Sequence, residues 1–374
     1  MPVKEIKAKS ILRKHKKIDS WFVSCYGMNL YRGCLHNCVY CDGRAEKYNV
    51  EGEFGSHVAV KVNALEILSR ELDPAKKRVP LRPGYVMVGG GVGDGYQPAE
   101  ETYRLTRGVL ELLYRLNWPI HILTKSILVE RDLDIIKKIN EKKRAIVSFS
   151  FSSTDDRISK IFEPGVPPPS RRLETIARVK KEGIACGLFL MPVIPFISDG
   201  PEIMEETIKQ ARLVGIDFIV FSGMTLKEGR QKDYFYAALK EHYPDLLPQY
   251  INIYRDNKWG GATTAYYDSL ERSFRSLART YKIPIRIPQY LYKNILDQND
   301  LVVVMLEHMD YLLRFEGRPS PYGYAAYSIS QLKEPLSTMR DRLRSLKGVG
   351  RVTEGIVKEI LRTGTSNYYE RLMG

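Results

Sequence analysis

Residues 31–42 read Tyr31-Arg32-Gly33-Cys34-Leu35-His36-Asn37-Cys38-Val39-Tyr40-Cys41-Asp42, and they hold three of the five cysteines of the chain. The spacing is C-x3-C-x2-C, so three thiolates from one loop can converge on a single metal centre. Four cysteines fully ligate a cubane iron–sulfur cluster, and three leave one iron open. An open coordination position turns a structural metal into a reagent. We therefore predict a catalytic metal loop at Cys34, Cys38 and Cys41.

Two other interpretations of this loop are a zinc site and a group of structural cysteines. A structural zinc ion takes four protein ligands, and the sequence has no second cysteine or histidine pair at the spacing of a zinc finger. His36, inside the loop, is the nearby candidate for a fourth ligand. The iron–sulfur interpretation is favoured because it needs no fourth protein ligand.

The composition is that of a globular protein with two or three domains. The chain has 374 residues, of which 44% are hydrophobic and 27% charged, and this length permits a sizeable core. No apolar run is long enough to cross a membrane, and the N-terminus lacks the apolar core of a signal peptide. Five cysteines, three of them clustered, argue against a disulfide scaffold. We expect a cytoplasmic protein in a reducing compartment, with no membrane partner.

The net charge of the chain is +14. Such an excess favours polyanionic partners, with nucleic acid as the first candidate. A lysine-rich surface of the thermophile type gives the same excess, so the charge alone does not choose between them. Residues 1–20 form a basic arm with little apolar patterning, which contacts phosphates or is simply solvated. Its basic residues are Lys4, Lys7, Lys9, Arg13, Lys14, Lys16 and Lys17.

Beyond residue 20, strand-like and helix-like patterns alternate along the chain. Strands are predicted at 21–26, 84–88, 119–123, 145–151, 184–191 and 216–221, and helices at 61–71, 98–117, 131–140, 170–182 and 201–214. Strands separated by helices of this length form parallel βαβ units. Six units predict an α/β fold, a partial (β/α)6 barrel, whose chemistry lies at the C-terminal ends of the strands.

The cysteine loop, with Tyr40 just before its last cysteine, resembles the cluster loop of the radical S-adenosylmethionine (SAM) superfamily. Further blocks resemble its spore photoproduct lyase-like branch, often labelled DNA repair photolyase; they lie at 94–100, 123–126, 131–134, 150–155, 162–165, 171–174 and 191–195. This resemblance extends from about residue 10 to residue 225. It implies a [4Fe–4S] cluster, SAM as cofactor, and a reducing partner such as ferredoxin or flavodoxin. It leaves the substrate open, because a fold does not fix a function.

The resemblance also implies a role for individual residues. Cys34, Cys38 and Cys41 are expected to hold the cluster. The expected SAM contacts are Tyr40 at the adenine, Gly89, Gly90 and Gly91 at the amino group, Lys125 at the carboxylate, Ser150 at the ribose or carboxylate, and Met191 and Pro192 on the adenine side. Each also has an ordinary structural explanation. The glycines fit a plain turn, Lys125 a surface position, Ser150 a hydrogen bond to the backbone, and Met191 and Pro192 core packing.

The chain departs from spore photoproduct lyase at two positions. In that enzyme a tyrosine follows the third cluster cysteine and serves in radical transfer, whereas this chain has Asp42. The donor cysteine near the glycine-rich strand is also absent, so repair of the spore lesion by that relay is not expected. Tyr96 or Cys186 is a candidate hydrogen-atom donor, although core packing is the more ordinary role for Cys186. Asp94 is a candidate for proton transfer or for loop capping.

The C-terminal third continues beyond the barrel. Residues 226–290 interleave aromatic and basic residues, which either stack bases or cover the open side of the barrel by ordinary packing. Residues 291–374 are expected to be mainly helical. Within them, 343–361 resembles a helix-hairpin-helix, in which a helix ends at Leu346 and a hairpin joins it to the next one. Its predicted phosphate contacts are Lys347, Gly348, Gly350 and Arg351, and a plain Gly-x-Gly turn is the alternative.

Three functional hypotheses follow. In the first, a 5′-deoxyadenosyl radical formed inside the barrel removes a hydrogen atom from a DNA or RNA lesion or nucleotide. In the second, the chain is an iron–sulfur protein that binds nucleic acid without catalysis. In the third, the radical chemistry acts on a peptide or small molecule, and the positive charge is incidental.

Overall fold

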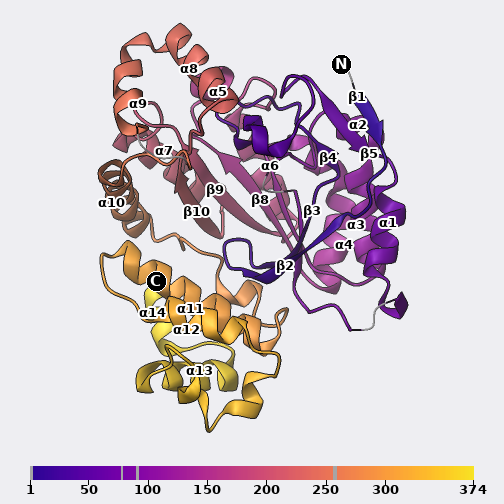
Figure 1. Cartoon of the computed structure of the whole chain (residues 1–374), viewed down its shortest axis with the longest axis vertical. Helices are drawn as coiled ribbons and strands as arrows, with labels where there is room; N and C mark the ends of the chain where they lie inside the picture. The colour runs from indigo at the N-terminus through magenta and orange to yellow at the C-terminus, as the bar shows by residue number, and fades with distance from the viewer. Residues whose placement is uncertain (1–2, 77–78, 90–91, 256–258) are drawn as a thin grey trace.

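The barrel is built on one seven-stranded sheet. The computed structural model describes residues 3–76, 79–89, 92–255 and 259–374. The strand order is β10-β9-β8-β7-β6-β3-β2, and these strands are β2 (Leu12–Asp19), β3 (Ser24–Met28), β6 (Tyr85–Val88), β7 (Ile120–Thr124), β8 (Ala145–Phe151), β9 (Ala185–Val193) and β10 (Phe218–Gly223). From β3 to β10 all neighbours pair in parallel, and β2 pairs antiparallel with β3. Six parallel strands in this curled sheet confirm the predicted partial barrel (Figure 1).

Helices cover the outer face of this sheet (Figure 1). They are α1 (Ala64–Leu72), α2 (Ala99–Tyr103), α3 (Leu105–Arg115), α4 (Leu133–Lys142), α6 (Pro169–Lys181) and α7 (Pro201–Leu213). The short helix α5 (Asp156–Phe162) instead lies near the cysteine loop, where Ile158 and Phe162 share a buried cluster with Val39 and Tyr40. The helix predicted over 98–117 is divided, because Arg104 adopts a φ of 50° between α2 and α3. The Glu100 carboxylate accepts hydrogen bonds from the Thr106 and Arg107 backbone N–H groups and so caps the start of α3.

The basic arm is folded, which the sequence pattern did not indicate. It forms β1 (Val3–Ile6) and β2, and β1 joins a small sheet of order β1-β5-β4 with β5 (Val58–Lys61) and β4 (Tyr31–Arg32). Most side chains of β1 and β2 are exposed or half-buried, so the apolar alternation that identifies a strand is absent. The first barrel strand is therefore β3, a few residues later than the predicted 21–26.

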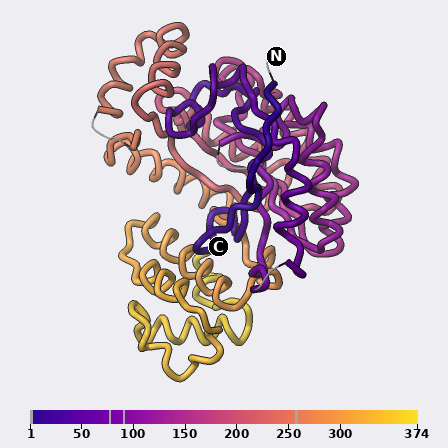
Figure 2. Tube along the Cα trace, turned by 45° about the vertical axis from the view of Figure 1, so that its right-hand side comes forward, coloured from indigo at the N-terminus to yellow at the C-terminus, as the bar shows by residue number. Residues whose placement is uncertain are grey.

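Residues beyond the barrel form two helical groups. The first comprises α8 (Arg230–His242), α9 (Leu247–Ile253) and α10 (Thr264–Tyr281), and the Phe274 ring of α10 stacks on Phe221 of β10 with centroids 4.0 Å apart. The second comprises α11 (Gln298–Phe315), α12 (Tyr322–Ser330), α13 (Arg351–Thr363) and α14 (Asn367–Met373) and lies below the barrel (Figures 1 and 2). Asp300 of α11 pairs with Arg82 at 3.1 Å and ties this group to the barrel.

A turn at residues 347–348 precedes α13, and the helical segment before this turn is not an α-helix. Gly348 has a φ of 81° and packs against Tyr324 of α12, so a side chain at this position would collide with it. The preceding helical segment is a three-residue 3-10 turn, Leu343–Ser345, and Leu346 is extended. The helix predicted to end at Leu346 is therefore a single turn. Within the described parts of the chain, no helix has the length and apolar character to cross a bilayer.

Candidate active site

The three clustered cysteines border one cavity at the C-terminal ends of the strands. This cavity of about 120 Å³ is lined by Cys34, His36, Asn37, Cys38, Cys41, Phe54, Gly93, Asp94, Leu123, Thr124, Lys125 and Ser150. Lys125 follows β7, and Ser150 lies near the end of β8. We call the C-terminal ends of β6 to β9, together with the cysteine loop and Glu163, the rim. The fold thus brings the thiols together with two of the predicted SAM contacts and with Asp94.

The thiols suit a cluster larger than one ion. Among the residues that the structure describes, no three Cys, His, Asp or Glu side chains lie close enough to bind a single metal ion together. What the cysteines share is the cavity, which has room for a group of several atoms. Burial raises the pKa of Cys34 and of Cys38. Thiols in such surroundings become thiolates when they bind metal, so these soft donors fit an iron–sulfur cluster.

Two buried side chains fix the backbone of the cysteine loop. Gln97 accepts a hydrogen bond from the Leu35 N–H at 2.9 Å and donates to the Gly33 carbonyl at 3.2 Å. Arg44 donates to the Cys38 carbonyl at 3.1 Å and lies 3.4 Å from the ring centroid of Tyr234. Sequence reasoning gave neither residue a role, because each acts on backbone groups through contacts that no motif marks.

The segment after α5 also holds the loop. The Val39 N–H donates to the Phe162 carbonyl at 2.8 Å, and the Gly165 N–H donates to the His36 carbonyl at 3.0 Å. A Cβ at Gly165 would lie 2.4 Å from the Leu35 carbonyl oxygen, so only glycine permits this approach. Residues 162–165 therefore hold the backbone of the cysteine loop directly.

A buried carboxylate organises the charged side of the rim. Glu163 accepts hydrogen bonds from Arg172 at 2.5 Å, from Lys125 at 3.0 Å and from the Tyr40 hydroxyl. Burial opposes ionisation, but Arg172 and Lys125 hold the pKa of Glu163 well below its usual range. The Lys125 ammonium also donates to Ser150 Oγ at 2.9 Å. Tyr40, Lys125 and Ser150, which were predicted separately, thus meet in one network.

Asp94 fixes the end of β7. Its carboxylate accepts hydrogen bonds from Thr124 Oγ1 at 2.8 Å, from the Lys125 N–H at 2.7 Å and from the Tyr96 N–H at 2.8 Å. His36 Nδ1 lies 3.4 Å from the same carboxylate, and burial lowers the pKa of this imidazole. Asp94 therefore positions the backbone of Lys125 beside the cysteine loop.

The glycine run and the Met191-Pro192 pair occupy two further parts of the rim. Gly89 has a φ of 79°, and a Cβ there would lie 2.6 Å from the Leu123 carbonyl oxygen. Gly90 and Gly91 lie outside the described residues. The Met191 carbonyl accepts a hydrogen bond from Ser150 Oγ at 2.9 Å. Met191 and Pro192 therefore lie beside Ser150, which in turn contacts Lys125.

The two candidate hydrogen-atom donors lie away from the cavity. The Tyr96 side chain is buried, and the charges nearest to its hydroxyl are Asp132 and Glu100 in the helical layer. Cys186 of β9 pairs in register with Val147, whereas its neighbour Gly187 pairs with Ser148. Since successive strand residues alternate between faces, Cys186 lies on the face opposite to that of Ser148 and Ser150. Neither donor candidate lines the cavity with the cysteines.

Asp42, directly after the third cysteine, anchors the loop. Its carboxylate accepts hydrogen bonds from Lys227 Nζ at 2.6 Å and from Thr225 Oγ1 at 2.8 Å. The Gln231 amide donates both to this carboxylate, at 3.2 Å, and to the Tyr40 carbonyl, at 2.9 Å. The aromatic and basic segment therefore closes over the cysteine loop through Asp42.

Comparisons with known proteins bear on the family of the chain. Residues 28–211 match the family model of the Radical SAM superfamily. The chain is 29% identical over 262 residues to an uncharacterized protein of Mycobacterium bovis, covering 69% of this chain and 75% of that one. It is also 29% identical over 194 residues to spore photoproduct lyase of Bacillus subtilis, covering 51% of this chain and 52% of that enzyme.

Solved structures of spore photoproduct lyase share the fold. A complex with dinucleoside spore photoproduct gives a TM-score of 0.53 at 16% identity, covering 75% of this chain and 79% of that one. A mutant of that enzyme with bound AdoMet gives a TM-score of 0.52 at 19% identity, covering 72% and 78%. Residues 28–211 therefore form a radical SAM domain, and proteins of the radical SAM superfamily use a [4Fe–4S] cluster and SAM. Within that superfamily the chain is similar to spore photoproduct lyase.

Proposed function

We propose that the chain is a radical SAM enzyme that removes a hydrogen atom from a nucleotide in DNA or RNA. The observation that carries the proposal is the shared cavity, in which three thiols of one loop face Lys125 and Ser150 at the ends of two neighbouring strands. Bound together, the cluster and SAM supply a 5′-deoxyadenosyl radical. A reducing partner such as ferredoxin or flavodoxin provides the electron, in a reducing compartment such as the cytoplasm.

The residues of the rim divide the work of binding. Cys34, Cys38 and Cys41 hold the cluster and leave one iron to the cofactor. Lys125 is held beside Ser150 by Glu163, which suits recognition of a carboxylate by a point charge. Asp94 is a positioning residue, because it accepts hydrogen bonds from the Tyr96 and Lys125 N–H groups and so holds the Lys125 backbone in place.

We propose nucleic acid as the substrate because the chain has a large positive net charge. The chain carries +14 formal charges, and a polyanion is the partner that such an excess favours. Asp42 is engaged with Lys227 and Thr225, and a carboxylate in that arrangement cannot replace a tyrosyl radical relay. We therefore propose a substrate other than the spore lesion.

The first experiment measures SAM cleavage. Protein reconstituted with iron and sulfide without oxygen, then reduced with dithionite, is expected to convert SAM to 5′-deoxyadenosine. Incubation with deuterium-labelled oligonucleotides that carry damaged or modified bases is expected to place the label in that product. An intact cluster with no 5′-deoxyadenosine formed would overturn the enzymatic proposal, and label transfer from peptides alone would overturn the nucleic-acid substrate.

A further inference from the structure

A large groove runs along β2. It has a volume of about 1160 Å³ and is walled by residues of β2, the β2–β3 turn, β3 and the start of the cysteine loop. Its charged lining comprises six cations and two carboxylates: Arg13, Lys14, Lys16, Lys17, Arg32 and Lys61 against Asp19 and Glu307. The groove therefore concentrates positive charge within one concave surface, which raises the local concentration of anions.

Four of the groove cations take part in none of the ion pairs found among the described residues. Lys17 pairs with Glu307 of α11, and Lys61 donates to the Asn29 carbonyl at 2.6 Å. In the part of the chain that the structure describes, no ion pair or side-chain hydrogen bond involves the other four, which are Arg13, Lys14, Lys16 and Arg32. These four cations line one concave surface, so their charge is concentrated in the groove.

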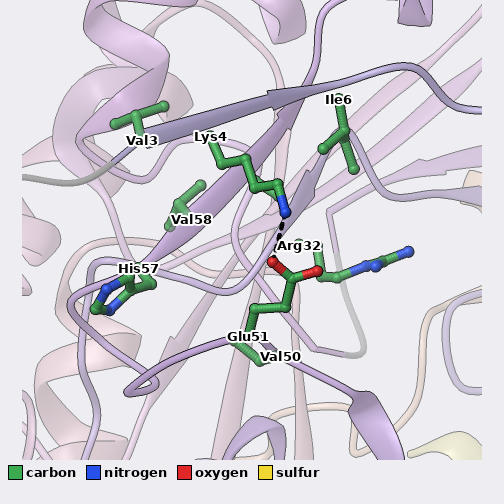
Figure 3. Close-up of a pocket in the computed structure, with 9 residues that line it drawn as sticks. Val3, Lys4, Ile6, Arg32, Val50, Glu51, His57 and Val58 are labelled. Carbon is green, nitrogen blue, oxygen red and sulfur yellow. Dashed lines mark hydrogen bonds and ion pairs between the residues drawn. The ribbon is translucent and has the colours of Figure 1, made fainter.

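The groove ends beside the cysteine cavity. Gly33 and Val92 line the groove, while the next residues in sequence, Cys34 and Gly93, line the cavity of the thiols. Gly89, at the end of β6, also faces the groove. Arg32 sits at this junction, and Figure 3 shows its side chain extending away from the Lys4–Glu51 pair. A long anion in the groove would thus pass within reach of the site where the radical forms.

We propose that this groove binds the sugar–phosphate backbone of a nucleic-acid strand and delivers one of its nucleotides to the cysteine cavity. The proposal rests on the function proposed above for its substrate class and adds where that substrate lies. β2 supplies Arg13, Lys14 and Lys16 on one side, and Arg32 supplies the charge nearest to the cluster loop. Phosphate contacts of this kind position a strand without reading its sequence.

A second explanation for lysines on β2 is protection of an exposed sheet edge. β2 is the last strand of the seven-stranded sheet, and lysine on an edge strand prevents pairing with other chains. This explanation accounts for Lys14 and Lys16 but not for Arg32, which lies on β4 across the groove. It also predicts that neutral substitutions cause aggregation without changing nucleic-acid affinity, and this difference can be measured.

The test compares groove and surface substitutions in the reconstituted protein. The groove variants are the triple substitution Arg13→Gln, Lys14→Gln, Lys16→Gln and the single substitution Arg32→Gln. The surface control is Lys138→Gln with Lys181→Gln, two exposed helix residues outside the groove. A charge control, Arg13→Lys with Lys14→Arg and Lys16→Arg, keeps the cations. Binding of labelled single-stranded and duplex oligonucleotides is measured by fluorescence anisotropy over a salt series.

Each phosphate contact contributes a slope of about 0.9 to a plot of log Kd against log salt concentration. The loss of one contact is therefore expected to weaken binding roughly five-fold at 0.15 M salt. We expect the triple variant to bind roughly 100-fold more weakly with a smaller slope, and Arg32→Gln about five-fold more weakly. The surface and charge controls should bind as the unsubstituted protein does. If the triple variant aggregates, the Arg32→Gln measurement decides, because Arg32 is not on the edge strand.

Equal losses in the groove and surface variants would overturn the proposal, as would tighter binding of poly-glutamate than of oligonucleotides. SAM cleavage without any nucleic-acid affinity would overturn the groove and leave the radical chemistry standing. Groove-dependent binding without SAM cleavage would support the groove and overturn the radical chemistry. The groove proposal and the radical SAM proposal can therefore be overturned independently of each other.

Discussion

The rim and the base of the barrel bury polar groups in opposite ways. At the rim, Glu163 is ionised and lies between Arg172 and Lys125. Toward the base, His121 is neutral, with Nδ1 2.9 Å from the Phe22 carbonyl and Nε2 2.8 Å from Ser148 Oγ. Of these two buried groups, only Glu163 keeps a full charge away from water.

We interpret the charged group at the rim as part of a binding site and the neutral histidine at the base as a contribution to stability. Desolvating a charge is costly, and a buried ion pair seldom stabilises more than apolar packing would. A neutral hydrogen-bonded histidine carries no such cost. The charges of the rim are therefore best explained by a ligand that itself carries charges, as SAM does with its carboxylate, ammonium and sulfonium groups.

The largest expected effect comes from removing one thiol of the rim. Cys38→Ala leaves two ligands, so we expect the cluster to be lost and 5′-deoxyadenosine formation to fall to background. Iron content, the visible spectrum and product chromatography measure this directly. Cys25→Ala is the matched control, because Cys25 is also buried but lies against Pro83 and Asp300, and it should retain iron. A Cys38→Ala protein with full iron and activity would exclude the three-cysteine site.

The next effect comes from the central charge of the rim. Glu163→Gln leaves the Arg172 and Lys125 cations in a buried site without their counter-charge, which costs about 3–5 kcal/mol of unfolding free energy. Lys125 also loses its ion pair with Glu163, which keeps its ammonium beside Ser150. SAM should therefore bind more weakly. Urea unfolding and SAM equilibrium dialysis measure the two effects.

Glu174→Gln is the control for this substitution, because Glu174 pairs with Arg171 on the exposed side of α6. It should change stability by less than about 1 kcal/mol. Equal effects from the two substitutions would mean that the rim charges contribute no more than a surface pair.

At the base the expected effect depends on pH. Burial lowers the pKa of His121 from 6.5 to about 4. The folded protein therefore binds this proton less readily than the unfolded chain, so its contribution is complete above about pH 6.5 and is lost as the pH falls toward 4. Near pH 5 the loss is about 2 kcal/mol. His121→Gln should flatten this part of the stability profile, whereas His242→Gln, at an exposed position, should not.

The sequence predicted the rim better than it predicted what supports it. The cysteine loop, Lys125 and Ser150 sit in local motifs, and the parallel strands have buried apolar patterns that a short window detects. Gln97, Arg44 and Gln231 act through hydrogen bonds to backbone groups 6 to 191 residues away. Such contacts depend on the tertiary fold and leave no periodic signal in the chain.

The basic arm shows the same limit for secondary structure. β2 reads Leu-Arg-Lys-His-Lys-Lys-Ile-Asp, and only Ile18 in it is fully buried. The strand forms because β3 offers it an edge to pair with, for example Arg13 opposite Gly27. Side-chain hydrophobicity carries no information about that edge, so the groove it borders could be recognised only from the structure.

The smallest expected effect concerns Asp42, on the outer side of the rim. Its side chain is 37% exposed and its partner Lys227 is 15% exposed, so the pair is screened by water and contributes no more than about 1 kcal/mol. Asp42→Asn keeps the hydrogen bonds to Thr225 and Gln231, and we expect SAM cleavage within about two-fold of the unsubstituted protein. A loss as large as that of Glu163→Gln would show that the Asp42 charge takes part in the chemistry, and the contrast between a charged interior and a screened exterior of the rim would then fail. Product chromatography and thermal unfolding of the two variants side by side decide between these outcomes.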